Sequence, residues 1–334
     1  MSRVAVFFTG GTISMRTDAA AGGRVPTLDG TAILALVPGL DAIAEVVPID
    51  HGLTPASHFT FPALLELAAA VRNALADPTI DGAVVVQGTD TIEETSFLLD
   101  LVLDTPKPVV VTGAMRAASD DGYDGPVNLR DAVRCAASPD LRGQGVTVVM
   151  AGSIEPADDV TKTHASALDT FRSLNLGSLG RVDGDRVVAL RRRVGRRHVS
   201  TERAAERVHL ITAHVAMDGS LVDAALASGS DGFVIEATGA GNTSPLLLAA
   251  GERAMAAGLA VVLTTRCPAG RAGAGYAFPG GGATWVRAGA LLAEYLGGPK
   301  ARVALALGLG AGLDRDGLAR LLAGPDPDPV PAAE

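Results

Sequence analysis

The feature that most constrains the fold is a regular alternation of short aliphatic runs with longer amphipathic ones. The aliphatic runs are rich in Val, Ile and Leu and cover residues 3–9, 82–87, 107–113, 145–151, 208–212, 231–237 and 259–265. Apolar residues at helical spacing fill several of the intervals, at 61–75, 92–103, 126–137 and 244–258. Continuous aliphatic runs are typical of strands buried on both faces. Their alternation with helices predicts an α/β protein with a mostly parallel sheet.

The chain length and one break in this alternation predict two domains. At roughly 100–200 residues per domain, 334 residues make two domains or one large one. Residues 170–205 are rich in Gly and Arg and interrupt the alternation. We therefore expect a larger, doubly wound N-terminal domain over 1–190, a linker over 191–207 and a smaller α/β domain over 208–323. The Pro- and Asp-rich tail, 324–334, is predicted to be disordered.

The charge of the chain argues against some classes of partner. The net charge is −9, which disfavours binding to nucleic acid or to an anionic membrane surface. The only dense basic run, RRRVGRRH at 191–198, has no interleaved aromatic residues, and we expect it to be a solvated connector.

Cysteine and histidine usage favours a reduced protein without a metal. Cys135 and Cys267 are far apart in the sequence, as expected for reduced core thiols in a cytoplasmic protein. The six histidines show no ligand spacing, so no metal site is expected. The run Val4–Phe8 is too short for a signal peptide, and no uninterrupted apolar stretch reaches the roughly 18 residues of a membrane span.

Polar residues follow the predicted strands at the points where ligands bind in parallel sheets. Such sheets bind ligands outside the carboxyl ends of their strands. Thr9–Thr12 follow the first strand, Gly88–Thr91 the second and Ala114 the third, and Lys162 comes after the fourth. Glycines let a ligand approach the backbone, and a helix that starts after Thr89 can stabilise an oxyanion or a carboxylate.

Each of these signals also has an ordinary structural explanation. The two glycines can simply form a tight turn, and either Thr89 or Asp90 can be a helix N-cap. A single lysine such as Lys162 is most often solvated. A cap accounts for only one of the polar groups, so their combination favours a functional site.

Five segments resemble the bacterial-type L-asparaginase family, in the family's order and at its spacing. They are TGGTIS (9–14), QGTDTIEETSFLLD (87–100), KPVVVTGAMR (107–116), DGPVNLRDAV (124–133) and DDVTKTHASALDTF (158–171). GAGN (239–242) and KARVALALGL (300–309) are similar to it too. The resemblance extends over nearly the whole chain, to about residue 323.

The resemblance implies an amidohydrolase with no metal or organic cofactor. It implies that Thr12 is the nucleophile and that Thr89, Asp90 and Lys162 form a second cluster that directs proton transfer and the hydrolytic water. It also implies a homo-oligomer, usually a tetramer of close dimers with active sites at the dimer interface. The residues expected to contact a small amide substrate are Gly11, Arg24, Ser57, Gly88, Asp90 and Ala114.

Two positions depart from the family pattern. The family's N-terminal loop carries a Tyr that contacts the nucleophile, whereas residues 16–30 contain none and Arg24 takes its place. Arginine cannot relay a proton as a phenol does, but it can bind an anion or simply face solvent. Ala56 stands where the family has a Ser that binds the substrate α-carboxylate, and Ser57 serves only if the loop shifts by one residue. A missing hydrogen bond to a charged group costs roughly 1.5–3 kcal/mol.

These departures leave several functions open. The first is hydrolysis of L-asparagine or a close relative, and the second is the same chemistry on another amide, an imide or a lactam. The third is a small-molecule-binding protein without turnover. A tRNA-dependent amidotransferase subunit is disfavoured by the acidic charge and the lack of an added tRNA-binding domain. A Ser-His-Asp hydrolase and a dinucleotide enzyme are disfavoured because neither motif occurs in the required context.

Overall fold

The structure is a computed structural model that describes residues 1–18 and 20–323, with only the backbone described for Arg24 and Pro26. The chain divides into two compact units, Met1–Arg193 and Val194–Glu334. The predicted linker over 191–207 lies across this division. The tail predicted to be disordered, 324–334, lies outside the described residues.

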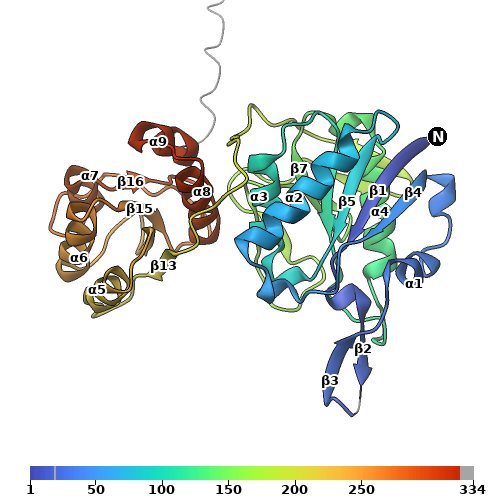
Figure 1. Cartoon of the computed structure of the whole chain (residues 1–334), viewed down its shortest axis with the longest axis horizontal. Coiled ribbons are helices and arrows are strands. Elements are labelled where there is room, and N and C mark those ends of the chain that lie inside the picture. The colour runs from blue at the N-terminus through green and yellow to red at the C-terminus, as the bar shows by residue number, and fades with distance from the viewer. Residues whose placement is uncertain (19, 324–334) are drawn as a thin grey trace, which may run out of the picture. The chain divides into compact units, whose positions relative to one another are not determined.

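The N-terminal unit is built on one large sheet, which the described residues form from eight strands. The strands are β1 Ser2–Phe8, β4 Ala44–Asp50, β5 Gly82–Val86, β6 Val109–Thr112, β7 Val146–Met150, β8 Ser153–Pro156, β11 Gly180–Asp183 and β12 Arg186–Ala189. Their order is β12-β11-β8-β7-β6-β5-β1-β4, of which Figure 1 labels β7, β5, β1 and β4. Strands β4, β1, β5, β6 and β7 are mutually parallel, whereas β8, β11 and β12 add antiparallel pairs at one edge. The predicted mostly parallel sheet is confirmed.

Helices cover both faces of this sheet. They are α1 Gly30–Ala35, α2 Phe61–Ala76, α3 Ile92–Val102 and α4 Gly125–Ala136. Alternate β1 residues, Val4, Val6 and Phe8, share a buried cluster with α1 and α4. Helices α2 and α3 pack against each other and cover the opposite face (Figure 1). The predicted doubly wound arrangement follows, because every central strand buries both of its faces.

Short elements in the connections carry most of the candidate site residues. Two hairpins are formed by β2 Met15–Asp18 with β3 Gly23–Pro26 and by β9 Val160–Lys162 with β10 Phe171–Ser173. The 3₁₀ turns are η1 Thr12–Ser14, η2 Leu40–Ala42, η3 Ala56–His58, η4 Thr89–Thr91 and η5 Pro139–Leu141. The periodicity of the sequence predicted none of these, since elements of three or four residues are too short to show a period.

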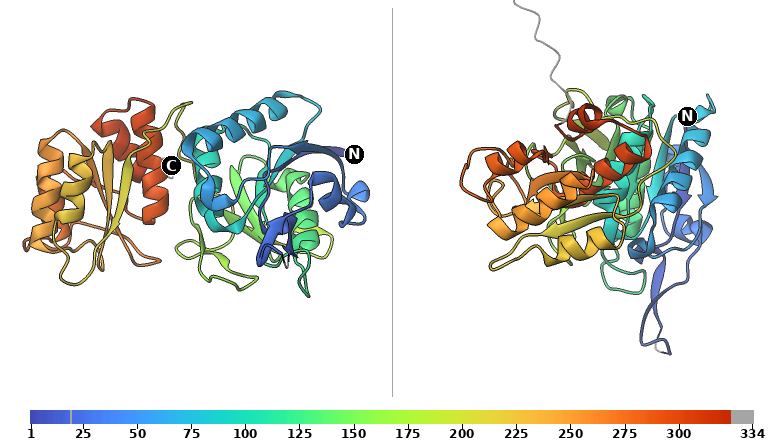
Figure 2. Two further views of the ribbon diagram at one scale, coloured as in Figure 1. Left: turned by 60° about the horizontal axis from the view of Figure 1, so that its bottom comes forward. Right: turned by 60° about the vertical axis from the view of Figure 1, so that its left-hand side comes forward.

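The C-terminal unit repeats the α/β design on a smaller scale. Its four parallel strands are β13 Val208–Thr212, β14 Gly232–Ala237, β15 Ala260–Thr265 and β16 Leu291–Leu292. Helices α5 Ser220–Ala227, α6 Pro245–Ala256 and α7 Gly282–Ala288 cover one face. Helices α8 Gly298–Gly310 and α9 Arg315–Ala323 cover the other, as Figure 2 shows. The predicted smaller α/β domain is confirmed.

The basic run at 191–198 is not wholly the solvated connector that its composition suggested. The side chain of Arg193 is only 5% exposed. Its guanidinium pairs with Asp100 at 2.9 Å and with Asp158 at 2.8 Å, and it donates to the Gln144 carbonyl at 3.0 Å. The prediction was wrong at Arg193, because the buried carboxylate of Asp100 and the partly buried carboxylate of Asp158, both distant in the sequence, supply its counter-charge.

Replacing Arg193 by Met should lower the free energy of unfolding by about 3 kcal/mol or more, because Asp100 would keep a buried charge without its cation. Urea unfolding of the two proteins measures the change. Arg172, whose ion pair with Asp169 is more than half exposed, supplies the control. Arg172→Met should cost about 0.5 kcal/mol. Equal losses in the two variants would contradict a special role for Arg193.

The two cysteines lie in different environments. Cys135 is buried on α4, and burial raises the pKa of its thiol. Cys267 follows β15 and is exposed, so the prediction of two core thiols was wrong at this position. Among the described residues, no helix has the length and apolar character needed to cross a membrane.

Candidate active site

The backbones of the first two polar turns touch each other at two glycines. Gly11 follows β1 with a φ of +94°, and a Cβ built on it would lie 2.1 Å from the backbone nitrogen of Gly88, which follows β5. No side chain fits such a gap, and a positive φ favours glycine. The TGGT and QGTD turns are therefore two parts of one surface at the carboxyl edge of the sheet.

Thr12 stands directly after this contact, at the start of η1. Thr12 is half-buried, whereas Ile13 and Ser14 are buried. The turn is closed locally, because the backbone nitrogen and the hydroxyl of Ser14 both donate to the Gly11 carbonyl, at 2.9 and 2.7 Å. The structure thus holds the main chain around Thr12 and leaves this residue half-buried at the sheet edge.

Lys162, Thr89 and Asp90 form the second cluster that the resemblance implied. The ammonium of Lys162 donates to the Thr89 hydroxyl at 2.9 Å and pairs with the Asp90 carboxylate at 3.6 Å. The side chain of Lys162 is 16% exposed and that of Asp90 is 65% exposed. Contacts across 73 residues of sequence therefore gather a cation, a hydroxyl and an accessible carboxylate.

Ala114 follows β6 at the same edge and is fully buried. The preceding residue, Gly113, has a carbonyl that accepts from the side-chain amide of Asn128 at 3.0 Å. Asn128 also donates to Asp124, whose carboxylate accepts from the backbone nitrogen of Met115. Asp124 and Asn128 were not predicted to support the site, although both lie in DGPVNLRDAV, one of the segments that carries the resemblance.

Tyr123 makes a contact that sequence reasoning missed. Its phenol donates to the carbonyl of Ile13 at 2.7 Å, across 110 residues of sequence, and so restrains the residue that follows Thr12. Burial of the ring and the neighbouring Asp124 carboxylate raise the pKa of this phenol. The proton that bonds to Ile13 is therefore retained in the folded protein well into alkaline conditions.

This raised pKa predicts a loss of stability at alkaline pH. The unfolded chain releases the Tyr123 proton above about pH 10, before the folded protein does. The stabilising effect is therefore complete below pH 10 and declines as the pH rises. Between pH 9 and pH 11, the wild type should lose about 0.5–1 kcal/mol more unfolding free energy than Tyr123→Phe, after allowance for solvent screening of the half-buried ring. Urea titrations at both pH values measure this, and equal losses would contradict it.

Ala56 and Ser57 lie on η3 in different environments. Ala56 is buried, and a Cβ on Gly88 would lie 3.0 Å from its Cβ. Its carbonyl accepts from the Thr91 hydroxyl at 3.1 Å. Ser57 is exposed. The structure therefore brings the methyl group of Ala56, and not a hydroxyl, against the Gly88 turn.

Arg24 lies on β3, where its backbone pairs in register with Thr17 of β2. Its side chain is outside what the structure describes, so the anion-binding role considered for it stays a prediction.

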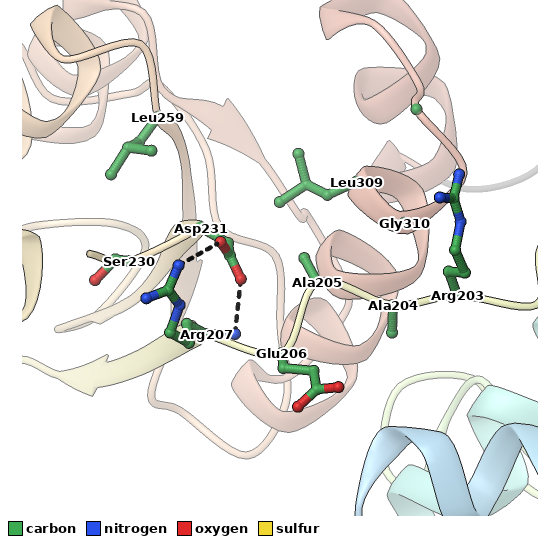
Figure 3. A pocket seen from close by; sticks show the side chains of 11 residues that line it. Arg203, Ala204, Ala205, Glu206, Arg207, Ser230, Asp231, Leu259, Leu309 and Gly310 are labelled. Carbon is green, nitrogen blue, oxygen red and sulfur yellow. Dashed lines mark hydrogen bonds and ion pairs between the residues drawn. The ribbon is translucent and has the colours of Figure 1, made fainter. Parts of the chain in front are cut away.

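No group of three or more His, Cys, Asp or Glu side chains that could hold a metal ion is found among the described residues. A groove of about 730 Å³ lies on the C-terminal unit (Figure 3). It is lined near the amino ends of β13, β14 and β15, and its Arg207 pairs with Asp231 at 3.6 Å. None of the predicted site residues lines it. The candidate site is therefore the carboxyl edge of β1, β5 and β6 together with Lys162.

This arrangement is suited to acyl transfer. Thr12 offers a hydroxyl nucleophile beside a turn without side chains, where a carbonyl group can approach the backbone. Lys162 and Thr89 offer a hydrogen-bonded pair that can move protons, and Asp90 offers an accessible carboxylate for a substrate cation. Helix α3 begins directly after the turn that carries Thr89 and Asp90, so the N-terminus of the helix favours negative charge at the site.

Comparisons with known proteins match both parts of the chain to the same family. A family model for "Asparaginase, N-terminal" matches residues 3–195, and one for "Glutaminase/Asparaginase C-terminal domain" matches residues 207–322. An L-asparaginase of Bacillus licheniformis is 34% identical over 91% of this chain and 94% of its own. A probable L-asparaginase of Deinococcus radiodurans is 38% identical over 96% and 97%. L-asparaginase 2 of Bacillus subtilis is 31% identical over 80% and 73%.

Proposed function

Because the chain belongs to the asparaginase family, we propose that it is an amidohydrolase that converts the side-chain amide of L-asparagine to a carboxylate and ammonia. The observation that carries the proposal is the cluster of Lys162, Thr89 and Asp90, in which Thr89 and Asp90 directly follow the Gly88 turn that touches the Gly11 turn. The contact between the two turns supports the proposal, because Thr12 directly follows Gly11 and the cluster to which we assign proton transfer follows Gly88.

The proposed reaction has two steps. The Thr12 hydroxyl oxygen attacks the amide carbon and forms an ester, while the amide nitrogen takes up a proton and leaves as ammonia. A water then attacks the ester and regenerates the Thr12 hydroxyl. Lys162 and Thr89 direct the proton transfers and position the water. Asp90 holds the substrate α-ammonium, and the Ala114 carbonyl accepts from the leaving amide nitrogen.

The test is ammonia release by the purified chain with L-asparagine over a wide range of concentrations. Turnover that is lost in Thr12→Ala supports the proposal. No turnover with any amide under conditions where the protein is folded would reject it, and would favour a binding protein without activity.

A second candidate is the same reaction on a larger amide, imide or lactam. It is favoured by Ala56, which presents a methyl group to Gly88, while Ser57 is exposed. A pocket without a hydroxyl for the α-carboxylate binds free asparagine less tightly. A panel of asparagine derivatives blocked at the α-carboxylate distinguishes the candidates, because a blocked substrate with higher kcat/KM than asparagine supports the second.

We also propose that the protein is a cytoplasmic homo-oligomer, either a dimer or a tetramer made of close dimers. Membership of the family supports the oligomer, and the free thiols of Cys135 and Cys267 support a reducing compartment. Light scattering on the purified chain measures its mass in solution, and a monomer of 33.8 kDa would contradict it.

A further inference from the structure

The strand that carries Lys162 lies outside the large sheet. Strand β9 pairs with β10 in a separate two-stranded sheet, in which Lys162 is in register with Phe171. The main-sheet ladder therefore does not determine how far the Lys162 ammonium lies from Thr89. Contacts of the β9–β10 hairpin with helix α3 and with β8 have to do so.

Two neighbouring residues of β9 bind the start of α3 and the η4 turn that leads into it. The Thr161 hydroxyl donates to the Glu93 carboxylate, and the Lys162 ammonium donates to the Thr89 hydroxyl at 2.9 Å. Thr89 lies on the 3₁₀ turn η4, and Glu93 lies on helix α3, which follows that turn directly. Glu93 lies in the first turn of α3, where the helix dipole favours its negative charge.

The rest of the hairpin is restrained independently. Asp158, just before β9, pairs with Arg193, which also binds Asp100 on α3. The backbone nitrogen of Ser173 on β10 donates to the Glu155 carboxylate at 3.1 Å. Loss of the Thr161 contact should therefore release the strand next to Lys162 without unfolding the hairpin.

We propose that Thr161 and Glu93 are a positioning pair that holds Lys162 against Thr89. Lysine has a flexible side chain, so the position of its backbone strongly affects whether its ammonium reaches a fixed partner. A displacement of about 1 Å can cost roughly 100-fold in rate when the partner is catalytic. The effect on rate rests on the proposed function, whereas the effect on the position of Lys162 does not.

Chemical labelling tests the position of Lys162 without reference to activity. An N-hydroxysuccinimide ester of acetate modifies lysine amines, and peptide mass spectrometry measures the rate at each site. In Thr161→Val, Lys162 should be modified about tenfold faster than in the wild type, because the strand has lost a hydrogen bond to a charged group. Lys107, whose ammonium donates to the Leu75 and Asp77 carbonyls, serves as the internal reference.

A matched control lies on the other side of Lys162. The Thr163 hydroxyl donates to the Thr170 carbonyl at 2.8 Å, which lies within the same connection and not on α3. Thr163→Val removes a comparable hydroxyl and should leave the labelling of Lys162 within about twofold of the wild type. Equal acceleration in both valine variants would overturn the proposal, because it would indicate general loosening of the hairpin.

Two substitutions of Glu93 separate hydrogen bonding from charge. Glu93→Gln keeps an oxygen that accepts from Thr161, whereas Glu93→Ala does not. We expect ammonia release by Glu93→Gln within about threefold of the wild type, and a kcat roughly 10–100-fold lower, with a nearly unchanged KM, for Glu93→Ala and for Thr161→Val. Equal losses in the Gln and Ala variants would overturn the proposal in favour of a direct role for the Glu93 charge.

The labelling result separates failure of this inference from failure of the proposed function. Unchanged labelling of Lys162 in Thr161→Val would overturn the positioning pair whatever the activity. Faster labelling with unchanged ammonia release would support the positioning pair and would instead reject the role of Lys162 in turnover.

Discussion

Thr12→Ala should lower kcat for ammonia release by about 10⁴-fold or more, because no other group replaces a missing nucleophile. Thr12 is half-buried, and the turn that contains it is closed by a hydrogen bond from the Ser14 hydroxyl to the Gly11 main-chain carbonyl. That bond does not involve the Thr12 side chain. The substitution should therefore change the free energy of unfolding by only about 0.5 kcal/mol. Initial rates with L-asparagine and a urea titration of the same preparations measure the two effects.

Thr12→Ser supplies the matched control for this prediction. Serine retains the hydroxyl and loses only a methyl group, so it should recover activity to within about 10–100-fold of the wild type. Activity that is unchanged in Thr12→Ala would remove Thr12 as the nucleophile. Equal loss in the Ala and Ser variants, with intact folding, would indicate that the methyl group and not the hydroxyl is required.

Lys162→Met is expected to have the second largest effect, a fall in kcat of about 10²–10⁴-fold. Methionine keeps much of the apolar side chain but loses the ammonium that donates to Thr89 and pairs with Asp90. Because the Asp90 side chain is 65% exposed, water can solvate its carboxylate, and the ion pair should contribute little to stability. Kinetics with L-asparagine and thermal unfolding measure these two expectations.

Lys107→Met is the control for Lys162→Met. The Lys107 ammonium donates to the carbonyls of Leu75 and Asp77, and Lys107 precedes the amino end of β6, whereas the candidate site lies at the carboxyl ends. This variant should keep normal turnover even if it is less stable. Near-normal rates in Lys162→Met would remove Lys162 from the proposed mechanism, and a similar fall in both variants would show that the effect is not specific to the site.

The sequence supported the fold prediction because strand burial leaves a local pattern. Val84, Val85 and Val86 are all fully buried in β5, as expected for a strand with helices on both faces. The amphipathic run at 61–75 corresponds to α2, and the acidic residues at 93 and 94 lie in the first turn of α3. These features repeat within a few residues, so they can be read without knowledge of distant contacts.

The candidate site was only partly predictable. The order of strands and turns placed Thr12, Thr89 and Asp90 at one sheet edge, because parallel strands bring their carboxyl ends together. Nothing local indicated that Tyr123 donates to Ile13, and the resemblance left open whether Ala56 or Ser57 faces the site, where the structure packs Ala56 against Gly88. These contacts depend on where separate loops pack together. Loop sequences have no hydrophobic periodicity, so their packing cannot be predicted from the sequence pattern.

By itself the sequence determined the βαβ alternation, the division into a larger and a smaller α/β part, and the residue types that acyl transfer requires. Only the tertiary structure decided that Gly11 and Gly88 touch, that Lys162 reaches Thr89 from a separate hairpin, and that Arg193 is buried between two carboxylates. The physical reason is the separation in sequence between the residues involved. Hydrophobic periodicity is a pattern among neighbouring residues, whereas hydrogen bonds and ion pairs across 73 or 93 residues exist only once the chain has folded.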